Sequence, residues 1–308
     1  MVIFTTILLN NVIPLFIVIF LGAVLYRAFK LDIKTLSKIS FFLLTPAVVF
    51  HLLYSTEISF LLFGQIMLFF CMFMLLQYGV LEIVIRIRGL QEGMKAALRN
   101  SVLFANSANY GLPINQLAFS GNPLTLSVQV VILVLQSFLP NTYGIYSVNS
   151  HKSSFRSMFR TIASQPVIYA IPIALLMRGL QIPLPNFLAT PITYITDAFI
   201  GLALITLGVQ LGSMKWSMPT GKIIDLTLSV TLRLLVGPAI AALTLWMLGM
   251  DGLVAKALVV SSAVPTSLSS VLLAVEFDNE PEFSSQAVFF STLISTLTVT
   301  LMIWMLHI

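Results

Sequence analysis

Long apolar stretches separated by short polar segments recur along the whole chain. Ten of them are long enough to cross a bilayer as helices, which takes roughly 20 apolar residues each. They run over about 5–26, 35–54, 58–85, 95–119, 124–148, 162–180, 187–212, 222–248, 254–275 and 284–306. The pattern predicts an all-α integral membrane protein, with ten transmembrane helices in a single membrane domain.

The composition agrees with this pattern and excludes a soluble globule. Hydrophobic residues make up 58% of the 308 positions and charged residues only 9%, whereas soluble domains carry about 25% charged residues. The mean hydropathy is +1.01. Although the formal net charge is +5, the cations lie between apolar stretches, where they orient helices in the bilayer. We therefore expect no nucleic-acid partner.

The distribution of lysine and arginine predicts the orientation of the chain. With the N-terminus outside, thirteen of the sixteen cations fall on the cytoplasmic side, as the positive-inside rule requires. The exceptions are Arg178 and Lys256 at outer ends and Arg233 inside a span. The protein is thus predicted to be a multi-pass protein of the cell (plasma) membrane with both termini extracytoplasmic.

Polar residues interrupt the fourth apolar stretch, which reads Asn106-Ser-Ala-Asn-Tyr-Gly-Leu-Pro-Ile-Asn-Gln116. They lie near the middle of the crossing, about 11 to 21 residues after Lys95 at 1.5 Å per residue. Pro113 lacks an amide hydrogen and Gly111 tolerates most backbone angles, so the helix is predicted to break there. A membrane tolerates such a break only inside protein or beside a cavity. The candidate substrate-binding residues of this stretch are Asn106, Asn109, Tyr110, Gly111, Pro113 and Asn115.

The ninth stretch contains a similar interruption, Ser261-Ser-Ala-Val-Pro-Thr-Ser-Leu-Ser-Ser270. Its proline lies among hydroxyl groups that can cap freed amides. Where two broken helices cross, the helix ends that begin there present N–H groups to anions, and the carbonyl ends face cations. Ser262, Pro265 and Thr266 are therefore further candidate substrate-binding residues. For either proline alone, a kink that serves only packing is the alternative explanation.

The proline positions suggest an internal duplication. Pro14 and Pro166 are 152 residues apart, as are Pro113 and Pro265. Transporters are often built from two inverted halves of five helices. We predict two such repeats, over about 1–150 and 160–308, with the interrupted helices 4 and 9 at corresponding positions.

The interruptions also carry a resemblance to the auxin efflux carrier family of transporters. The most specific element is Phe104-Ala-Asn-Ser-Ala-Asn-Tyr-Gly-Leu-Pro-Ile114, in which an asparagine is followed seven positions later by a proline. Weaker similarities lie at 36–46, 201–208 and 263–267. The resemblance covers nearly the whole chain. It implies the inverted-repeat fold that this family shares with bile acid and sodium/proton transporters.

The resemblance further implies how the helices divide. Helices 1, 2, 6 and 7 would form a scaffold, and helices 3–5 and 8–10 a transport domain around the crossing of helices 4 and 9. It also implies transport of an organic anion, with Asn106 near the carboxylate, and a homodimer formed through the scaffold. The plant members have a long central loop, which this chain lacks, so control by phosphorylation there has no counterpart.

Three charged side chains inside predicted spans are candidates for function. Arg233 is expected to bind or balance the organic anion, with snorkelling or pairing with Asp225 as the alternative. Glu82 and Asp197 are candidate sites for a coupling proton, although carboxylates near helix ends are mostly solvated. Spans 4, 5, 9 and 10 contain no Asp or Glu, which disfavours exchange of cations.

These features favour a secondary transporter of a small organic anion, either a mono- or dicarboxylate or an aromatic carboxylate, auxin-like or malate-like. The crossed helices would move in an elevator-type displacement. A potential of 100 mV, negative inside, drives each negative charge outward by about 2.3 kcal/mol, so export requires no coupling ion, and proton or sodium coupling is left open. The alternative is a ligand sensor or partner subunit of the same fold. Catalytic constellations, cofactor motifs and metal clusters are not recognisable, so we expect no enzyme, no cofactor and no metal site.

Overall fold

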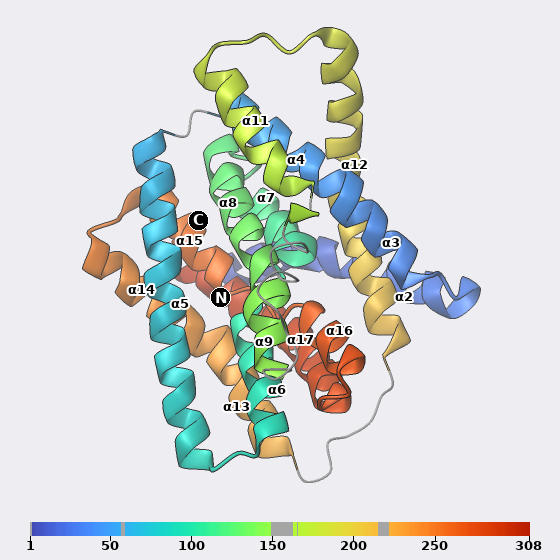
Figure 1. Ribbon diagram of the computed structural model, residues 1–308, viewed down its shortest axis with the longest axis vertical. Helices are drawn as coiled ribbons and strands as arrows, with labels where there is room; N and C mark the ends of the chain where they lie inside the picture. Colours follow the sequence, from blue (N-terminus) through green and yellow to red (C-terminus); the bar gives the residue numbers. More distant parts are fainter. Residues whose placement is uncertain (1, 57–58, 149–162, 165, 215–221) are drawn as a thin grey trace.

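The computed structural model describes residues 2–56, 59–148, 163–164, 166–214 and 222–308. These residues are helical almost throughout, and the one β-bridge among them is isolated. Long helices surround shorter ones near the middle of the molecule (Figure 1). The prediction of an all-α protein is confirmed. The predicted cytoplasmic cations Lys152, Arg156, Arg160 and Lys215 lie outside the described residues.

The helices follow one another with short connections. The α-helices are α1 (Val2–Ile7), α2 (Ile13–Phe29), α3 (Ile33–Ile39), α4 (Thr45–Ser55), α5 (Phe60–Arg88), α6 (Glu92–Leu103), α7 (Leu112–Ala118), α8 (Pro123–Leu139), α9 (Ile145–Val148), α11 (Val167–Gly179), α12 (Asn186–Ser213), α13 (Ile223–Thr231), α14 (Gly237–Leu248), α15 (Gly252–Ser262), α16 (Ser269–Glu276) and α17 (Pro281–Met305). Five π-helical turns join some of them: η1 (Leu8–Val12), η2 (Ser40–Leu44), η3 (Ser107–Gly111), η4 (Pro140–Gly144) and η5 (Leu232–Val236).

Seven helical segments among the described residues are long and apolar enough to cross a membrane. They are Thr5–Phe29, Ile33–Ser55, Leu61–Arg88, Pro123–Val148, Asn186–Ser213, Ile223–Leu248 and Pro281–Met305. Large apolar side chains such as Leu61, Leu75 and Trp246 are exposed, as expected where lipid covers a protein. The chain is therefore a multi-pass membrane protein. The other three predicted spans correspond to shorter helices, so the number of ten crossings stays a prediction.

Four of the five π-helical turns end two residues before a proline. The prolines concerned are Pro14 after η1, Pro46 after η2, Pro113 after η3 and Pro238 after η5. A proline ring clashes with the carbonyl four residues earlier and offers it no N–H. In a π-helical turn, which is wider than an α-helical turn, hydrogen bonds join residues five apart. The helix can therefore continue past the proline. These prolines therefore lie inside continuous helical segments.

The interruption of the fourth apolar stretch falls earlier than the sequence predicts. The helix α6 ends at Leu103, residues 104–106 are not helical, and the chain resumes as η3 and α7. Gly111 has helical angles, with φ −64° and ψ −45°, and Pro113 lies in the first turn of α7. The predicted break at Pro113 is therefore wrong, because the π-helical turn accommodates this proline.

The equal spacing of the two proline pairs does not mark equivalent positions. Pro265 lies in the non-helical segment between α15 and α16, whereas Pro113 lies within a helix. The residues that face each other across the two interruptions are Ala105 and Thr266. The proposed duplication thus gains no support from the prolines.

Glycines allow α2 and α12 to pack with their backbones in contact. A Cβ atom on Gly208 would lie 1.9 Å from the carbonyl oxygen of Ile19, and one on Gly22 would lie 2.3 Å from that of Ile205. Small residues that permit such close approach are a common basis for helix pairing in membranes. The helix α4 in turn packs against α11 and α12. Together α2, α4, α11 and α12 form one packed group (Figure 1).

Replacing Gly208 by alanine should destabilise this group, because the new methyl group would collide with backbone rather than with a flexible side chain. Overpacking of this kind costs about 1–3 kcal/mol. Gly201 on the same helix has open space around its Cα, so Gly201→Ala is the matched control. Thermal unfolding of purified variants measures the difference. Equal melting temperatures for the two variants would contradict the close packing.

Candidate functional site

The two interrupted segments lie side by side and pair through one isolated antiparallel β-bridge, between Ala105 and Thr266. The amide of Asn106 donates to the carbonyl of Pro265 at 2.9 Å, and the amide of Ser267 donates to that of Phe104 at 2.8 Å. Between them, the amide of Ala105 donates to the side-chain oxygen of Gln136 at 3.1 Å. Backbone that would otherwise be unpaired in an apolar interior is satisfied in this way.

Thr266 ties the second interruption to two neighbouring helices. Its amide donates to the hydroxyl of Ser291 on α17 at 3.1 Å, and its own hydroxyl donates to the carbonyl of Ser101 on α6 at 2.7 Å. The side chain is fully buried. Thr266, one of the polar residues predicted at the membrane centre, therefore serves to satisfy and anchor the broken backbone.

Arg233 binds the carbonyl ends of both interrupted helices. Its guanidinium donates to the carbonyls of Val264 at 2.8 Å, Val102 at 3.0 Å and Ser262 at 2.8 Å. The side chain is 0% exposed. The predicted alternative, pairing with Asp225, is wrong, because that carboxylate lies 3.1 Å from the Nε atom of Arg88.

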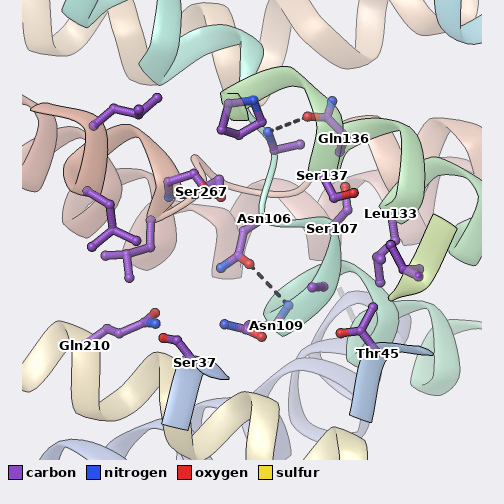
Figure 2. Close-up of a pocket in the computed structure, with 18 of the residues that line it drawn as sticks. Ser37, Thr45, Asn106, Ser107, Asn109, Leu133, Gln136, Ser137, Gln210 and Ser267 are labelled. Carbon is purple, nitrogen blue, oxygen red and sulfur yellow. Dashed lines mark hydrogen bonds between the residues drawn. The ribbon is translucent and has the colours of Figure 1, made fainter. Parts of the chain in front are cut away.

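A cavity of about 380 Å³ lies beside the paired interruptions. Figure 2 shows Asn106 and Asn109 on one side of it and Ser37, Thr45 and Gln210 on another. Several of its walls are apolar, and they are formed by Phe42, Leu133, Val167, Leu268, Leu272 and Leu273. Glu276 is exposed and is the only Asp, Glu, Lys or Arg among the described lining residues.

Two helical segments begin at this cavity with unpaired donors. Asn106 caps η3 by accepting from the amide of Asn109 at 3.2 Å, and its own side-chain NH₂ has no partner. Ser267 accepts from the amide of Ser269 at the start of α16. Ala108 and Leu268 line the cavity, and their amides make no hydrogen bond within the described structure. Helix beginnings with free N–H groups attract anions.

Only part of the predicted set of site residues lines the cavity. Asn106 and Asn109 do so, whereas the remaining candidates are buried in its supports: Tyr110, Gly111, Pro113, Asn115, Ser262, Pro265, Thr266 and Arg233. The hydroxyls of Tyr110 and Ser295 lie 3.0 Å apart. At Gly111, a Cβ atom would lie 2.5 Å from the side-chain nitrogen of Gln129. The direct contact predicted between Arg233 and the anion finds no support in this arrangement.

Several polar lining residues were not predicted from the sequence. They come from helices outside the two interrupted stretches, and they are Ser37, Thr45, Gln136, Ser137, Ser164 and Gln210. Gln210 is buried, and its side-chain oxygen has no partner. The sequence did contain a signal for Gln210. Its side-chain amide stands near the end of α12, where few other residues are polar.

The two carboxylates proposed as proton sites lie away from the cavity. Glu82 forms a bidentate ion pair with Arg99, at 2.6 and 2.8 Å. Asp197 is exposed on α12. Neither lines the cavity. Groups of three or more metal-ligating side chains are absent among the residues that the structure describes.

Comparison with known proteins identifies relatives over most of the chain. The profile of the family described as membrane transport protein matches residues 150–303, which is half of the chain. An uncharacterized transporter of Methanothermobacter thermautotrophicus is 24% identical over 271 residues, which cover 88% of each chain. Auxin efflux carrier component 2 of Oryza sativa subsp. japonica is 29% identical over 126 residues, 41% of this chain and 20% of the carrier. Component 1 of Arabidopsis thaliana is 25% identical over 152 residues, 49% of this chain and 24% of the carrier.

The fold and the site define a multi-pass helical membrane protein with a cavity at two paired helix interruptions. The chain belongs to the membrane transport protein family, which includes the auxin efflux carriers, and it is a transmembrane transporter. The predicted family resemblance is confirmed. The matched region spans a quarter or less of the plant carriers.

Removing the side-chain amide of Gln136 should destabilise the paired interruptions. In Gln136→Leu the buried amide of Ala105 loses its acceptor, a loss that costs about 1–3 kcal/mol. The control is Gln65→Leu, at an exposed position of α5. Thermal unfolding should show a lower melting temperature for the first variant alone. If Gln136→Leu melts like the wild type, the hydrogen bond does not hold the interruption.

Proposed function

We propose that this transporter is a secondary carrier of a small organic anion, which binds in the cavity beside the paired interruptions. The observation that carries the proposal is the convergence of two helix beginnings on one cavity. Ala108 and Leu268 line this cavity and have amides without a partner, and the buried NH₂ group of Asn106 has none either. A carboxylate can accept several such bonds at once.

The absence of cationic lining among the described residues fits this mode of recognition. Neutral donors and helix dipoles can hold a carboxylate without a fixed ion pair, which favours release as well as binding. Glu276 lies at the exposed rim and repels anions only weakly, since solvent screens it. The carboxylate is therefore proposed to sit beside Asn106 and Asn109, away from the rim.

The size and the apolar walls of the cavity set the proposed substrate class. A volume of about 380 Å³ is within the range of roughly 300–1,000 Å³ for small-molecule sites. Phe42, Leu133 and Leu272 offer apolar surface for the body of the ligand. We propose a mono- or dicarboxylate or an aromatic carboxylate. The names of the plant relatives refer to efflux of auxin, which supports a small organic substrate for this chain.

We further propose that the cavity separates a scaffold from a mobile transport domain. Its scaffold side carries Ser37, Thr45 and Gln210, and its transport side carries Asn106 and Ser267. The packed group of α2, α4, α11 and α12 supports the scaffold. Ten crossings in two inverted repeats, about 1–150 and 160–308, would follow from this division. A homodimer through the scaffold and elevator-type alternating access belong to the same proposal.

The proposed orientation makes this arrangement inward-facing. The cavity reaches the exposed residues Ser164 and Glu276, at helix ends that the positive-inside rule assigns to the cytoplasm. On the other side of the interruption, Asn115 and Gln129 are 0% exposed. Both termini would then be extracytoplasmic in the cell (plasma) membrane. Export down the membrane potential needs no second ion, and a proton or sodium ion is an optional partner.

Binding of carboxylates to purified protein tests the proposal. Ligands that bind the folded state raise the melting temperature in step with their saturation. The panel compares aliphatic and aromatic carboxylates with their neutral amides, with and without sodium. Carboxylates alone should stabilise the wild type, and they should lose this effect in Asn106→Ala. Asn186→Ala, at an exposed position of α12, is the control.

Two outcomes would contradict the proposal. If the neutral amides stabilise the protein as well as the carboxylates, the cavity is not an anion site. If Asn106→Ala keeps the affinity of the wild type, Asn106 is not part of it. Saturable binding without flux in liposomes would favour the alternative, a membrane ligand sensor or partner subunit of the same fold.

A further inference from the structure

The surroundings of Arg233 differ from those of an ordinary buried arginine. It projects from η5, and all three of its hydrogen bonds go to backbone carbonyls. Val102 is next to the last residue of α6, Ser262 is the last residue of α15, and Val264 lies two residues after it. The guanidinium therefore spans the carbonyl ends of both interrupted helices.

Other side chains add no counter-charge at this point. Within the described residues no carboxylate forms an ion pair with Arg233, and the nearby Gln77 donates to the carbonyl of Val102 at 3.5 Å. A small void of about 10 Å³ beside the guanidinium is lined mostly by phenylalanine and aliphatic side chains, with Ser261, Ser262 and Gln136. This void holds no more than about one water molecule.

The charges of the two helix ends balance that of the arginine. The carbonyl end of a helix carries roughly half a negative charge, so two such ends together match about one positive charge. Burial of an unpaired guanidinium would otherwise be strongly unfavourable. The three carbonyls also match the planar fork of donors that guanidinium presents and lysine does not.

In carriers with interrupted helices, carbonyl ends of this kind coordinate a sodium ion or a proton. We propose that Arg233 is a built-in cation that permanently occupies this position and holds the two helix ends together. It is a positioning residue, which makes ion binding at the crossing unnecessary and leaves the helix beginnings on the other side free for the anion. The expected effect of Arg233 on the affinity for the anion rests on the proposed function. The expected effect of Arg233 on the stability of the protein does not.

The first test measures stability without any substrate. The wild type should melt at the same temperature in sodium, lithium, potassium and choline chloride at equal ionic strength. Arg233→Ala should melt lower, and millimolar guanidinium chloride should recover part of the loss by entering the space left behind, whereas urea at the same concentration should not. Melting of the wild type that depends on sodium or lithium would overturn the proposal. So would an Arg233→Ala variant that guanidinium fails to recover.

If Arg233→Ala cannot be purified, two variants whose side chains are about as long as that of arginine distinguish the effect of the charge from that of the packing. Arg233→Lys keeps the positive charge with fewer bonds, and Arg233→Met keeps most of the volume without charge. The lysine variant should be the more stable of the two, with both below the wild type. Equal stability of the two, or higher stability of the methionine variant, would show that the charge does not hold the helix ends.

The second test uses a carboxylate that stabilises the wild type. Its Kd should be unchanged between sodium and choline for the wild type. In Arg233→Lys, which loses bonds to the carbonyl ends, the affinity should fall about tenfold or more, because the interruption no longer holds the two helix beginnings in place. If Arg233→Lys binds the carboxylate with the same Kd as the wild type, Arg233 has no positioning role. If no carboxylate binds the wild type, the proposed function fails while the stability test still decides on Arg233.

Discussion

The pairing of two broken helices is the interaction on which the rest of the structure depends. Interrupted backbone in an apolar interior must find partners for every freed amide and carbonyl. Here the segments around Ala105 and Thr266 supply some of them for each other, and buried side chains such as Gln136 and Ser291 supply others. Each interruption alone would leave unsatisfied groups, so neither half of the crossing is stable without the other.

This pairing also sorts the helix ends by charge. The carbonyl ends of α6 and α15 face Arg233, whereas η3 and α16 begin at the cavity with free amide groups. In the proposed function, the site for the anion lies next to a buried cation that does not contact the ligand. The cavity remains free of Lys and Arg within the described lining, which is compatible with a carrier that must release its substrate as readily as it binds it.

The sequence was sufficient for the class of protein and for the existence of two interruptions, because apolar length and clustered polar residues are local signals. It also singled out Asn106, which lines the cavity. It failed at Pro113, because a proline ends a helix only where no π-helical turn compensates for it. Arg233 was assigned to the ligand because a buried charge signals function without naming its partners, and these partners are backbone carbonyls distant in sequence. Ser37, Thr45 and Gln210 were missed, because their meeting at the cavity depends on how α3, α4 and α12 pack.

We propose that an organic anion binds in the cavity beside the paired interruptions and crosses the membrane there. The most direct test of this proposal is flux of a radiolabelled carboxylate in liposomes under an imposed potential, in the absence of sodium. We expect the carboxylate to move toward the positive side at a rate that grows with the potential. The matching neutral amide should show no such movement, and the Asn106→Ala variant should lose it. Flux of the amide at the same rate, or carboxylate flux that Asn106→Ala retains, would show that this is not the case.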